Sequence, residues 1–161
     1  MSEVIAGTFD LAPPTPQQFH ELASGLSDEE RHLLLDHGEE APFCGLFLTE
    51  KRDGAYTCRL CGLPLFRGGS KFESGTGWPS FTTPFAEGHL SEVRDTRYGV
   101  VRTEIVCARC GSHQGHVFPD GPPPTGLRYC INSGSLEFTP TGDHLPDKLG
   151  RGAPEGAILG G

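Results

Sequence analysis

The segments CRLCG at residues 58–62 and CARCG at residues 107–111 decide which fold this chain can adopt. Each has two cysteines separated by two residues and followed by a glycine. In a zinc knuckle the first cysteine ends a strand, and the glycine permits the left-handed backbone that aims N–H groups at sulfur. Two knuckles supply four thiolates, which close a tetrahedral site with no position for substrate. We therefore predict one structural zinc ion, and its ligands are Cys58, Cys61, Cys107 and Cys110.

Two other interpretations of these cysteines are open. They can be two separate thioredoxin-like redox motifs, but that chemistry places C-x-x-C beside a βαβ unit, and no such pattern is visible. Alternatively Cys107 and Cys110 can bind a metal together with His113 and His116. These histidines are closer together than in the usual finger spacing, and this set leaves the first cysteine pair without a role.

The composition favours short strands and loops. The chain has 161 residues, which suits one domain, and it contains 23 Gly and 14 Pro with 35% hydrophobic residues. A bound zinc contributes on the order of 10 kcal/mol to folding, which would help so loop-rich a chain. The net charge is −8 without a cluster of Lys or Arg. We expect no nucleic-acid partner, because binding to phosphates needs clustered positive charge.

Two short helices are predicted before the strands. Thr15 and Gln18 form a capping box at the start of the first, and Ser27 and Glu30 form one at the start of the second. Gly38 is predicted at the C′ position of the second helix.

Short strands are predicted after the helices, at residues 98–107, 127–132 and 135–140, with a loop at 121–126. Two helices that lead into many short strands predict an α+β or mainly β domain.

The ends of the chain have little to bury. We predict a flexible arm over residues 1–14, a single domain over 15–140 and a C-terminal tail over 141–161. No secretory signal and no apolar run of about 18 residues is present, so we expect a cytoplasmic monomer that does not enter membranes. Cysteines in that compartment are mostly reduced, and bind metals or react.

The segment RYCINSG at residues 128–134 contains a cysteine outside the two pairs, Cys130. If the segment is a strand, Arg128 and Asn132 lie on the same face as Cys130. A guanidinium favours the thiolate, and an amide can donate a hydrogen bond to an oxyanion. The alternative is a small buried apolar residue without chemistry.

Two further segments carry candidate site residues. GSHQGHVFPD contains His113 and His116, which are either general acids or ordinary loop residues. SGTGWPSF contains the only tryptophan, Trp78, which either forms one wall of an apolar pocket or packs over a strand edge.

Taken together, these segments resemble the B-type methionine sulfoxide reductases. SGTGWPSF, GSHQGHVF, RYCINSGSLEF and the two knuckles follow in the order of that family's signature segments, and the resemblance runs from Leu26 to Pro140. It implies a small mainly β domain with two antiparallel β-sheets and short N-terminal helices. It also implies an enzyme that reduces the R epimer of methionine sulfoxide, mostly in proteins, to methionine, and the free amino acid is a second candidate substrate.

The resemblance assigns a role to each candidate residue. Cys130 matches the nucleophile, which becomes a sulfenic acid when methionine leaves. The residues that match those binding and activating the sulfoxide are Arg128, His113, His116 and Asn132. Trp78 matches the ring that receives the ε-methyl group of the substrate, and Phe118 is assigned to the same substrate site.

One position departs from a common pattern of the family. Many members have a resolving cysteine where this chain has Thr76, which cannot form a disulfide. Some members place it in the N-terminal segment, where this chain has Cys44. We therefore predict a disulfide between Cys44 and Cys130 that thioredoxin or a similar reductant reduces. The alternative is an inert Cys44 and direct reduction of the sulfenic acid.

Two other classes of function compete with the reductase. A non-catalytic zinc-ribbon-like binding module would leave the Arg-x-Cys-x-Asn pattern unexplained. A zinc hydrolase needs an open metal position, which four thiolates do not leave.

Overall fold

The computed structural model describes residues 9–151, so residues 1–8 of the predicted arm and 152–161 of the predicted tail lie outside it. Two helices come first, α1 (Pro16–Ser24) and α2 (Asp28–Leu35). The strands are β1 (Gly54–Cys58), β2 (Pro64–Arg67), β3 (Lys71–Phe72), β4 (Ser80–Phe81), β5 (Leu90–Asp95), β6 (Arg102–Cys107), β7 (His113–Phe118), β8 (Arg128–Ile131) and β9 (Leu136–Pro140).

Both helices begin as predicted. The Thr15 hydroxyl accepts from the Gln18 N–H at 3.1 Å, and the Gln18 side chain accepts from the Thr15 N–H at 2.9 Å. Ser27 and Glu30 form the same reciprocal pair at the start of α2. Such a box satisfies two backbone donors that have no partner inside a helix, so these local sequences fix the helix starts.

The end of α2 differs from the prediction. Asp36 is the C-cap, and His37, not Gly38, has the left-handed backbone, with φ 58°. Gly38 is the second residue after the C-cap, and its N–H donates to the His32 carbonyl at 3.1 Å. The left-handed turn directs the chain, and the His37 side chain, toward the sheets.

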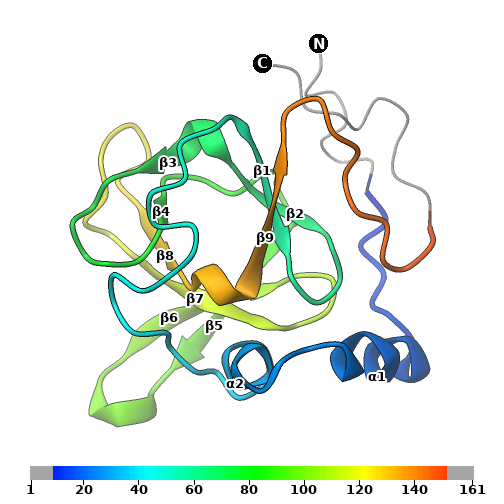
Figure 1. The fold of residues 1–161 in the computed structure, drawn as a ribbon. Helices are drawn as coiled ribbons and strands as arrows, with labels where there is room; N and C mark the ends of the chain where they lie inside the picture. The colour runs from blue at the N-terminus through cyan, green and yellow to red at the C-terminus, as the bar shows by residue number, and fades with distance from the viewer. Residues whose placement is uncertain (1–8, 152–161) are drawn as a thin grey trace.

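The strands form two antiparallel sheets, so the predicted fold class is confirmed (Figure 1). The order is β2-β1-β9 in the smaller sheet and β3-β4-β8-β7-β6-β5 in the larger one. The strands predicted at 127–132 and 135–140 are β8 and β9. The one predicted at 98–107 is shorter, because Arg97–Gly99 form a 3-10 turn in which Tyr98 has φ 64°.

Aromatic side chains join the two sheets. Phe66 on β2 stacks on Phe81 on β4, with ring centroids 4.3 Å apart. Tyr56 on β1 meets Phe81 edge-on at 5.1 Å. All three rings are fully buried, so this cluster removes a large apolar area from water and fixes one sheet against the other.

Parts of the predicted arm and tail contact the sheets within the described range. Phe9 and Leu11 pack against the core, and Leu145 and Leu149 are buried. The domain limits at residues 15 and 140 stay a prediction. Among residues 9–151, no helix has the length and apolar character needed to cross a membrane.

Candidate functional site

The two cysteine pairs occupy matched turns. Cys58 ends β1 and Cys107 ends β6. The N–H of Gly62 donates to the Cys58 carbonyl, and the N–H of Gly111 donates to the Cys107 carbonyl, both at 2.8 Å. The two glycines have φ of 85° and 79°. These are the left-handed positions predicted for two knuckles.

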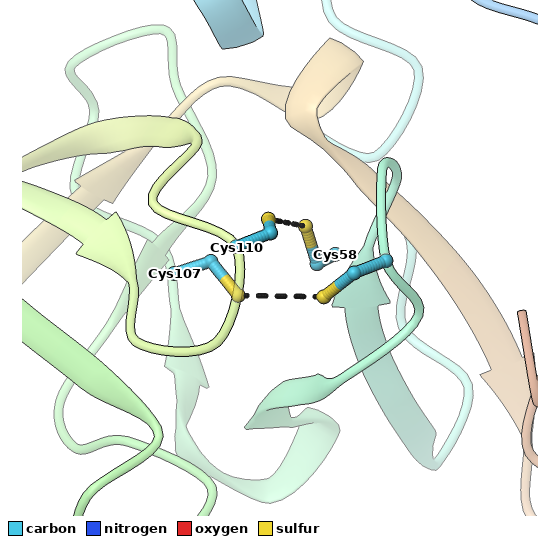
Figure 2. A group of neighbouring side chains, drawn as sticks. Cys58, Cys107 and Cys110 are labelled. Carbon is cyan, nitrogen blue, oxygen red and sulfur yellow. Dashed lines mark hydrogen bonds between the residues drawn. The ribbon is translucent and has the colours of Figure 1, made fainter. Parts of the chain in front are cut away.

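The four thiols converge on one point between the sheets. The Sγ atoms of Cys58 and Cys110 are 3.6 Å apart, as are those of Cys61 and Cys107. In Figure 2, Cys58 faces Cys107 and Cys110 across the gap between the two turns. All four sulfurs lie within 4.8 Å of one another, which suits tetrahedral ligation with metal–sulfur bonds of ~2.3 Å. The predicted four-cysteine cluster is therefore present.

Polar donors surround these sulfurs. Arg109 donates from Nε to Cys61 Sγ at 3.4 Å and from Nη2 to the Cys61 carbonyl at 2.7 Å. Gln114 donates from Nε2 to Cys58 Sγ at 3.6 Å. Both residues are buried, and hydrogen bonds to thiolates stabilise the charge of a metal–thiolate centre. The sequence analysis did not find either residue.

A pocket of about 260 Å³ opens beside β8. Six predicted site residues line it, namely Trp78, His116, Phe118, Arg128, Cys130 and Asn132. Glu39, Thr76 and Arg102 line it as well. Two predicted residues, His113 and Cys44, do not.

The register of β7 and β8 brings the central residues together. His116 is paired with Cys130, and Phe118 is paired with Arg128. Alternate residues of a strand share a face, so these four side chains project on the same side of the sheet. Gly115 allows the close approach of the strands, because a Cβ there would lie 2.0 Å from the Cys130 carbonyl oxygen.

The Cys130 thiol is partly buried. Burial raises its pKa, while the Arg128 charge and the Thr76 hydroxyl oppose that rise. The expectation that Arg128 favours the thiolate has the right direction, but burial outweighs it. Asp120 holds the guanidinium in place, at 2.8 Å from Nε and 3.1 Å from Nη2.

His116 is anchored by a buried carboxylate. Its Nε2 lies 2.8 Å from Oδ2 of Asp95, which is 1% exposed. Burial opposes ionisation of Asp95, yet the hydrogen bonds from His116 and the Arg97 N–H hold its pKa well below the usual range. Asp95 thus accepts from His116 as a carboxylate, and fixes which ring nitrogen carries the proton.

His113 lies behind His116, with ring centroids 5.5 Å apart. It is fully buried, and its Nδ1 is 2.6 Å from Oε2 of Glu104. The same oxygen lies 2.5 Å from Nδ1 of His37. Burial lowers the pKa of His113 to about 4, although Glu104 opposes this shift.

The cluster of His37, Glu104 and His113 also has the residue types of a metal site. Its short nitrogen–oxygen distances are those of hydrogen bonds, because tetrahedral ligation at ~2.1 Å would separate ligand atoms by roughly 3.4 Å. The rival ligand set of the sequence analysis is not brought together either, because both of its histidines are bonded to carboxylates.

The Asn132 amide is bonded to the segment after α2. Its Nδ2 donates to the Gly38 carbonyl at 2.9 Å, and its Oδ1 accepts from the Glu40 N–H at 3.1 Å. The Glu40 carboxylate accepts from the N–H groups of Ser133 and Gly134 at 2.7 and 3.0 Å. Trp78 Nε1 donates to the Glu40 carbonyl at 3.0 Å. The segment thus braces one wall of the pocket.

Cys44 is exposed and lies on a turn next to Phe43, which has φ 65°. The Phe43 N–H donates to the Gly77 carbonyl at 2.7 Å, so the turn is tied to the loop of Trp78. Cys44 lines a different cavity, of about 330 Å³, bordered by Glu40 and Ser133. Both Cys44 and Cys130 are free thiols in this structure.

Sequence reasoning missed the supporting carboxylates Glu40, Asp95, Glu104 and Asp120, together with His37. A buried acid within a strand, such as Glu104 in RTEIVC, is a signal that a buried partner is needed, but it does not identify the partner.

Comparison with known proteins agrees with this geometry. The model of the SelR domain matches residues 26–140. The peptide methionine sulfoxide reductase MsrB of Caulobacter vibrioides (strain NA1000 / CB15N) is 65% identical over 144 residues, which cover 89% of this chain and 91% of that protein. The MsrB of Xylella fastidiosa (strain M23) is 60% identical over 145 residues, or 90% and 94% of the two chains. The MsrB of Pseudomonas putida (strain KT2440) is 52% identical over 120 residues, or 74% and 92%.

The class is therefore that of the SelR domain proteins, which are oxidoreductases. Within it, this chain belongs to the B-type methionine sulfoxide reductase family, so the family and enzyme class predicted from the sequence are confirmed.

Proposed function

We propose that this chain reduces methionine-R-sulfoxide in oxidised proteins to methionine. Free methionine sulfoxide is a further candidate substrate. The observation that carries the proposal is the cross-strand pairing of Cys130 with His116, which line one pocket together with Trp78. A nucleophile, an acid and an apolar wall are the groups that reduction of a sulfoxide requires.

In the proposed reaction the Cys130 thiolate attacks the sulfoxide sulfur. As the sulfur–oxygen bond breaks, the oxygen takes up a proton from His116, with His113 behind it. That oxygen then bonds to the Cys130 sulfur, and the sulfur–sulfur bond made by the attack breaks with its electron pair left on the methionine sulfur. Methionine leaves, reduced by two electrons, and Cys130 becomes a sulfenic acid. Arg128 favours the thiolate, and Asp95 accepts from Nε2 of His116 and so orients its ring.

Selectivity for the R epimer is assigned to the pocket walls. Trp78 and Phe118 offer an apolar surface for the ε-methyl group, and His116 and Arg128 offer donors for the oxygen. A sulfoxide of the opposite hand would direct its oxygen at the rings. That arrangement leaves a polar atom without a hydrogen bond, which costs about 1–3 kcal/mol.

Cys44 is proposed to resolve the sulfenic acid. Its thiol would condense with Cys130, release water and form a disulfide that a thioredoxin-like dithiol reduces in the cytoplasm. Exposure of Cys44 supports this role, because the reductant needs access. The two thiols line different cavities, so the turn that carries Cys44 must move during each cycle.

Zinc is the proposed metal at the four-cysteine cluster. Its ligands would be Cys58, Cys61, Cys107 and Cys110, which together leave no open position. The ion would supply a structural link between the turns after β1 and β6, and no step of the reaction passes through it. Because cytoplasmic thiols stay reduced, that compartment suits both the cluster and the proposed nucleophile.

The test is a mass measurement on reduced, zinc-loaded protein. A slight excess of methionine-R-sulfoxide is added without reductant, and peptides are mapped. Loss of two hydrogens in a Cys44–Cys130 bridge is the expected result. Gain of one oxygen on Cys130 would keep the reductase and remove the role of Cys44. An unchanged mass without methionine would overturn the proposed function.

A further inference from the structure

His37 connects the buried groups behind the pocket with solvent. Its side chain is 41% exposed, whereas Glu104, which it contacts, is 2% exposed. The left-handed backbone of His37 follows directly after α2 and directs the ring at the carboxylate of β6. His37 lies outside the signature segments that carry the family resemblance.

One oxygen of Glu104 serves two imidazole rings. Burial would raise the pKa of Glu104, but the hydrogen bonds from His37 and His113 lower it below its usual value. An ionised carboxylate only accepts hydrogen bonds, so Nδ1 of each ring carries a proton. Nε2 is then the nitrogen through which His113 gains or loses a proton.

This Nε2 atom of His113 is buried and has no hydrogen-bond partner within residues 9–151. Its ring packs on His116, which lines the pocket with Cys130. A buried nitrogen without a partner is costly to keep, and such groups concentrate where chemistry needs them.

The other charged groups around the cluster are already engaged. Arg97 Nη2 lies 3.4 Å from Glu104 Oε1, and Arg97 and Arg102 both reach Asp95. Asp95 also accepts from His116. On α2, the His32 ring packs beside Gly38. His37 and His113 are therefore the two rings that compete for Glu104 Oε2.

We propose that His37 is a positioning residue for sulfoxide reduction, an inference that rests on the proposed function. By donating to Glu104, it holds the carboxylate against His113 and keeps the proton of that ring on Nδ1. Its own protonation opposes protonation of His113, because the ring centroids are only 5.4 Å apart. His37 thereby sets the pH range in which His113 can act.

Two variants separate the hydrogen bond from the titration. His37→Asn keeps a donor, since its Nδ2 is as many bonds from Cα as Nδ1 of histidine, but this amide does not titrate. His37→Gly removes the donor. Asn and Gly both tolerate a positive φ, so neither variant adds backbone strain. His20→Asn, at an exposed position of α1, is the matched control.

The first measurement is the single-turnover rate of methionine formation from methionine-R-sulfoxide, from about pH 3 to pH 8. This range contains the pKa of His113, which burial lowers to about 4. We expect H37G to be about tenfold slower, the effect of one lost charge-assisted hydrogen bond. H37N should restore the rate to within about twofold of wild type. In H37N the limb that follows protonation of His113 should move up by about one pH unit, since an opposing charge is gone.

The second measurement needs no activity. Nitrogen chemical shifts of the histidine rings report the tautomer of His113 by NMR. We expect the Nδ1–H form in wild type and H37N, and a mixture of tautomers in H37G.

Three results would overturn the inference. These are an unchanged rate and pH profile in H37G, an H37N variant as slow as H37G, and an unaltered His113 tautomer in H37G. If the wild-type protein forms no methionine, the proposed function fails instead, and the NMR result shows separately whether His37 positions His113.

Discussion

His116 on β7 and Cys130 on β8 are directly paired residues of adjacent antiparallel strands. Paired side chains on one face have Cβ atoms about 4.5–5.5 Å apart, so the register itself brings an imidazole next to a thiol. Asp95 holds the other side of that imidazole at 2.8 Å. The pairing thus arises from three neighbouring strands of the larger sheet, and not from a flexible loop.

Loss of the His116 imidazole, or of the Asp95 carboxylate that anchors it, should slow oxygen transfer. His116→Gln is expected to lower the single-turnover rate by about 10²–10⁴-fold, the usual contribution of a general acid. Asp95→Asn keeps an acceptor without its charge, and should cost roughly tenfold. Rapid-quench assay of methionine measures both. His144→Gln, at an exposed position, is the control, and an H116Q rate equal to that of the control would contradict the assignment.

Alkylation of Cys130 should depend on pH and on Arg128. Burial raises the pKa of this thiol, so its rate of reaction with iodoacetamide should reach half its maximum above the pH found for an exposed cysteine. The thiolate fraction rises with pH, and Arg128 stabilises the thiolate. Arg128→Gln should therefore move the midpoint upward by about 0.5–1 unit. An unchanged midpoint would show that Arg128 does not act on the thiol.

The two cysteine variants should behave differently. Cys130→Ser is expected to abolish methionine formation. Cys44→Ser should leave one turnover intact and slow thioredoxin-dependent turnover by at least about tenfold, because the disulfide cannot form. Thr76 lines the same pocket as Cys130, so adding Thr76→Cys to the Cys44→Ser protein should restore turnover. Full thioredoxin-dependent activity of Cys44→Ser alone would exclude a resolving role for Cys44.

Two substitutions of Trp78 separate the contribution of its aromatic ring from that of its hydrogen bond. Trp78→Phe keeps an aromatic wall but leaves the Glu40 carbonyl without its 3.0 Å donor, and should reduce kcat/KM by about fivefold. Trp78→Ala removes the wall, and should reduce kcat/KM by about 10²-fold and weaken the preference for the R epimer. Assays of kcat/KM with both epimers check this prediction. Equal losses of kcat/KM in the two variants would contradict it.

Loss of the proposed zinc ion should unfold the domain. Cys61→Ser removes one of four ligands, and is expected to abolish stoichiometric zinc and to cost on the order of 10 kcal/mol of folding free energy. Zinc content by atomic emission and thermal unfolding by circular dichroism measure this. Cys44→Ser, outside the cluster, should keep both the zinc and the unfolding temperature. A folded Cys61→Ser protein would show that the cluster is not needed for the fold.

Local sequence predicted those features that depend on neighbouring residues. The capping boxes at Thr15 and Ser27 appear as expected, because the atoms involved are three residues apart. The two C-x-x-C-Gly turns also have the predicted left-handed glycines, Gly62 and Gly111. The predicted C′ position of Gly38 was wrong, since the residue with the left-handed backbone after α2 is His37, one position earlier.

The candidate site was predictable only in part. Motif order placed Cys130, His116, Arg128 and Trp78, and these do line one pocket. The residues that hold these side chains in place were not predicted from the sequence. Glu40, for instance, lies in an acidic loop sequence, EEAPFC, and acts through backbone donors more than ninety positions away.

The amino-acid sequence alone was sufficient to predict the family, the clustering of four cysteines, the helix starts and the residue types in the pocket. Each of these follows from short motifs whose meaning lies in adjacent side chains and turns. The tertiary structure decided which partners those residues receive: Asp95 for His116, Glu104 for His113 and His37, and separate cavities for Cys44 and Cys130. Strand register and burial set these pairings, and both arise only when distant segments pack together.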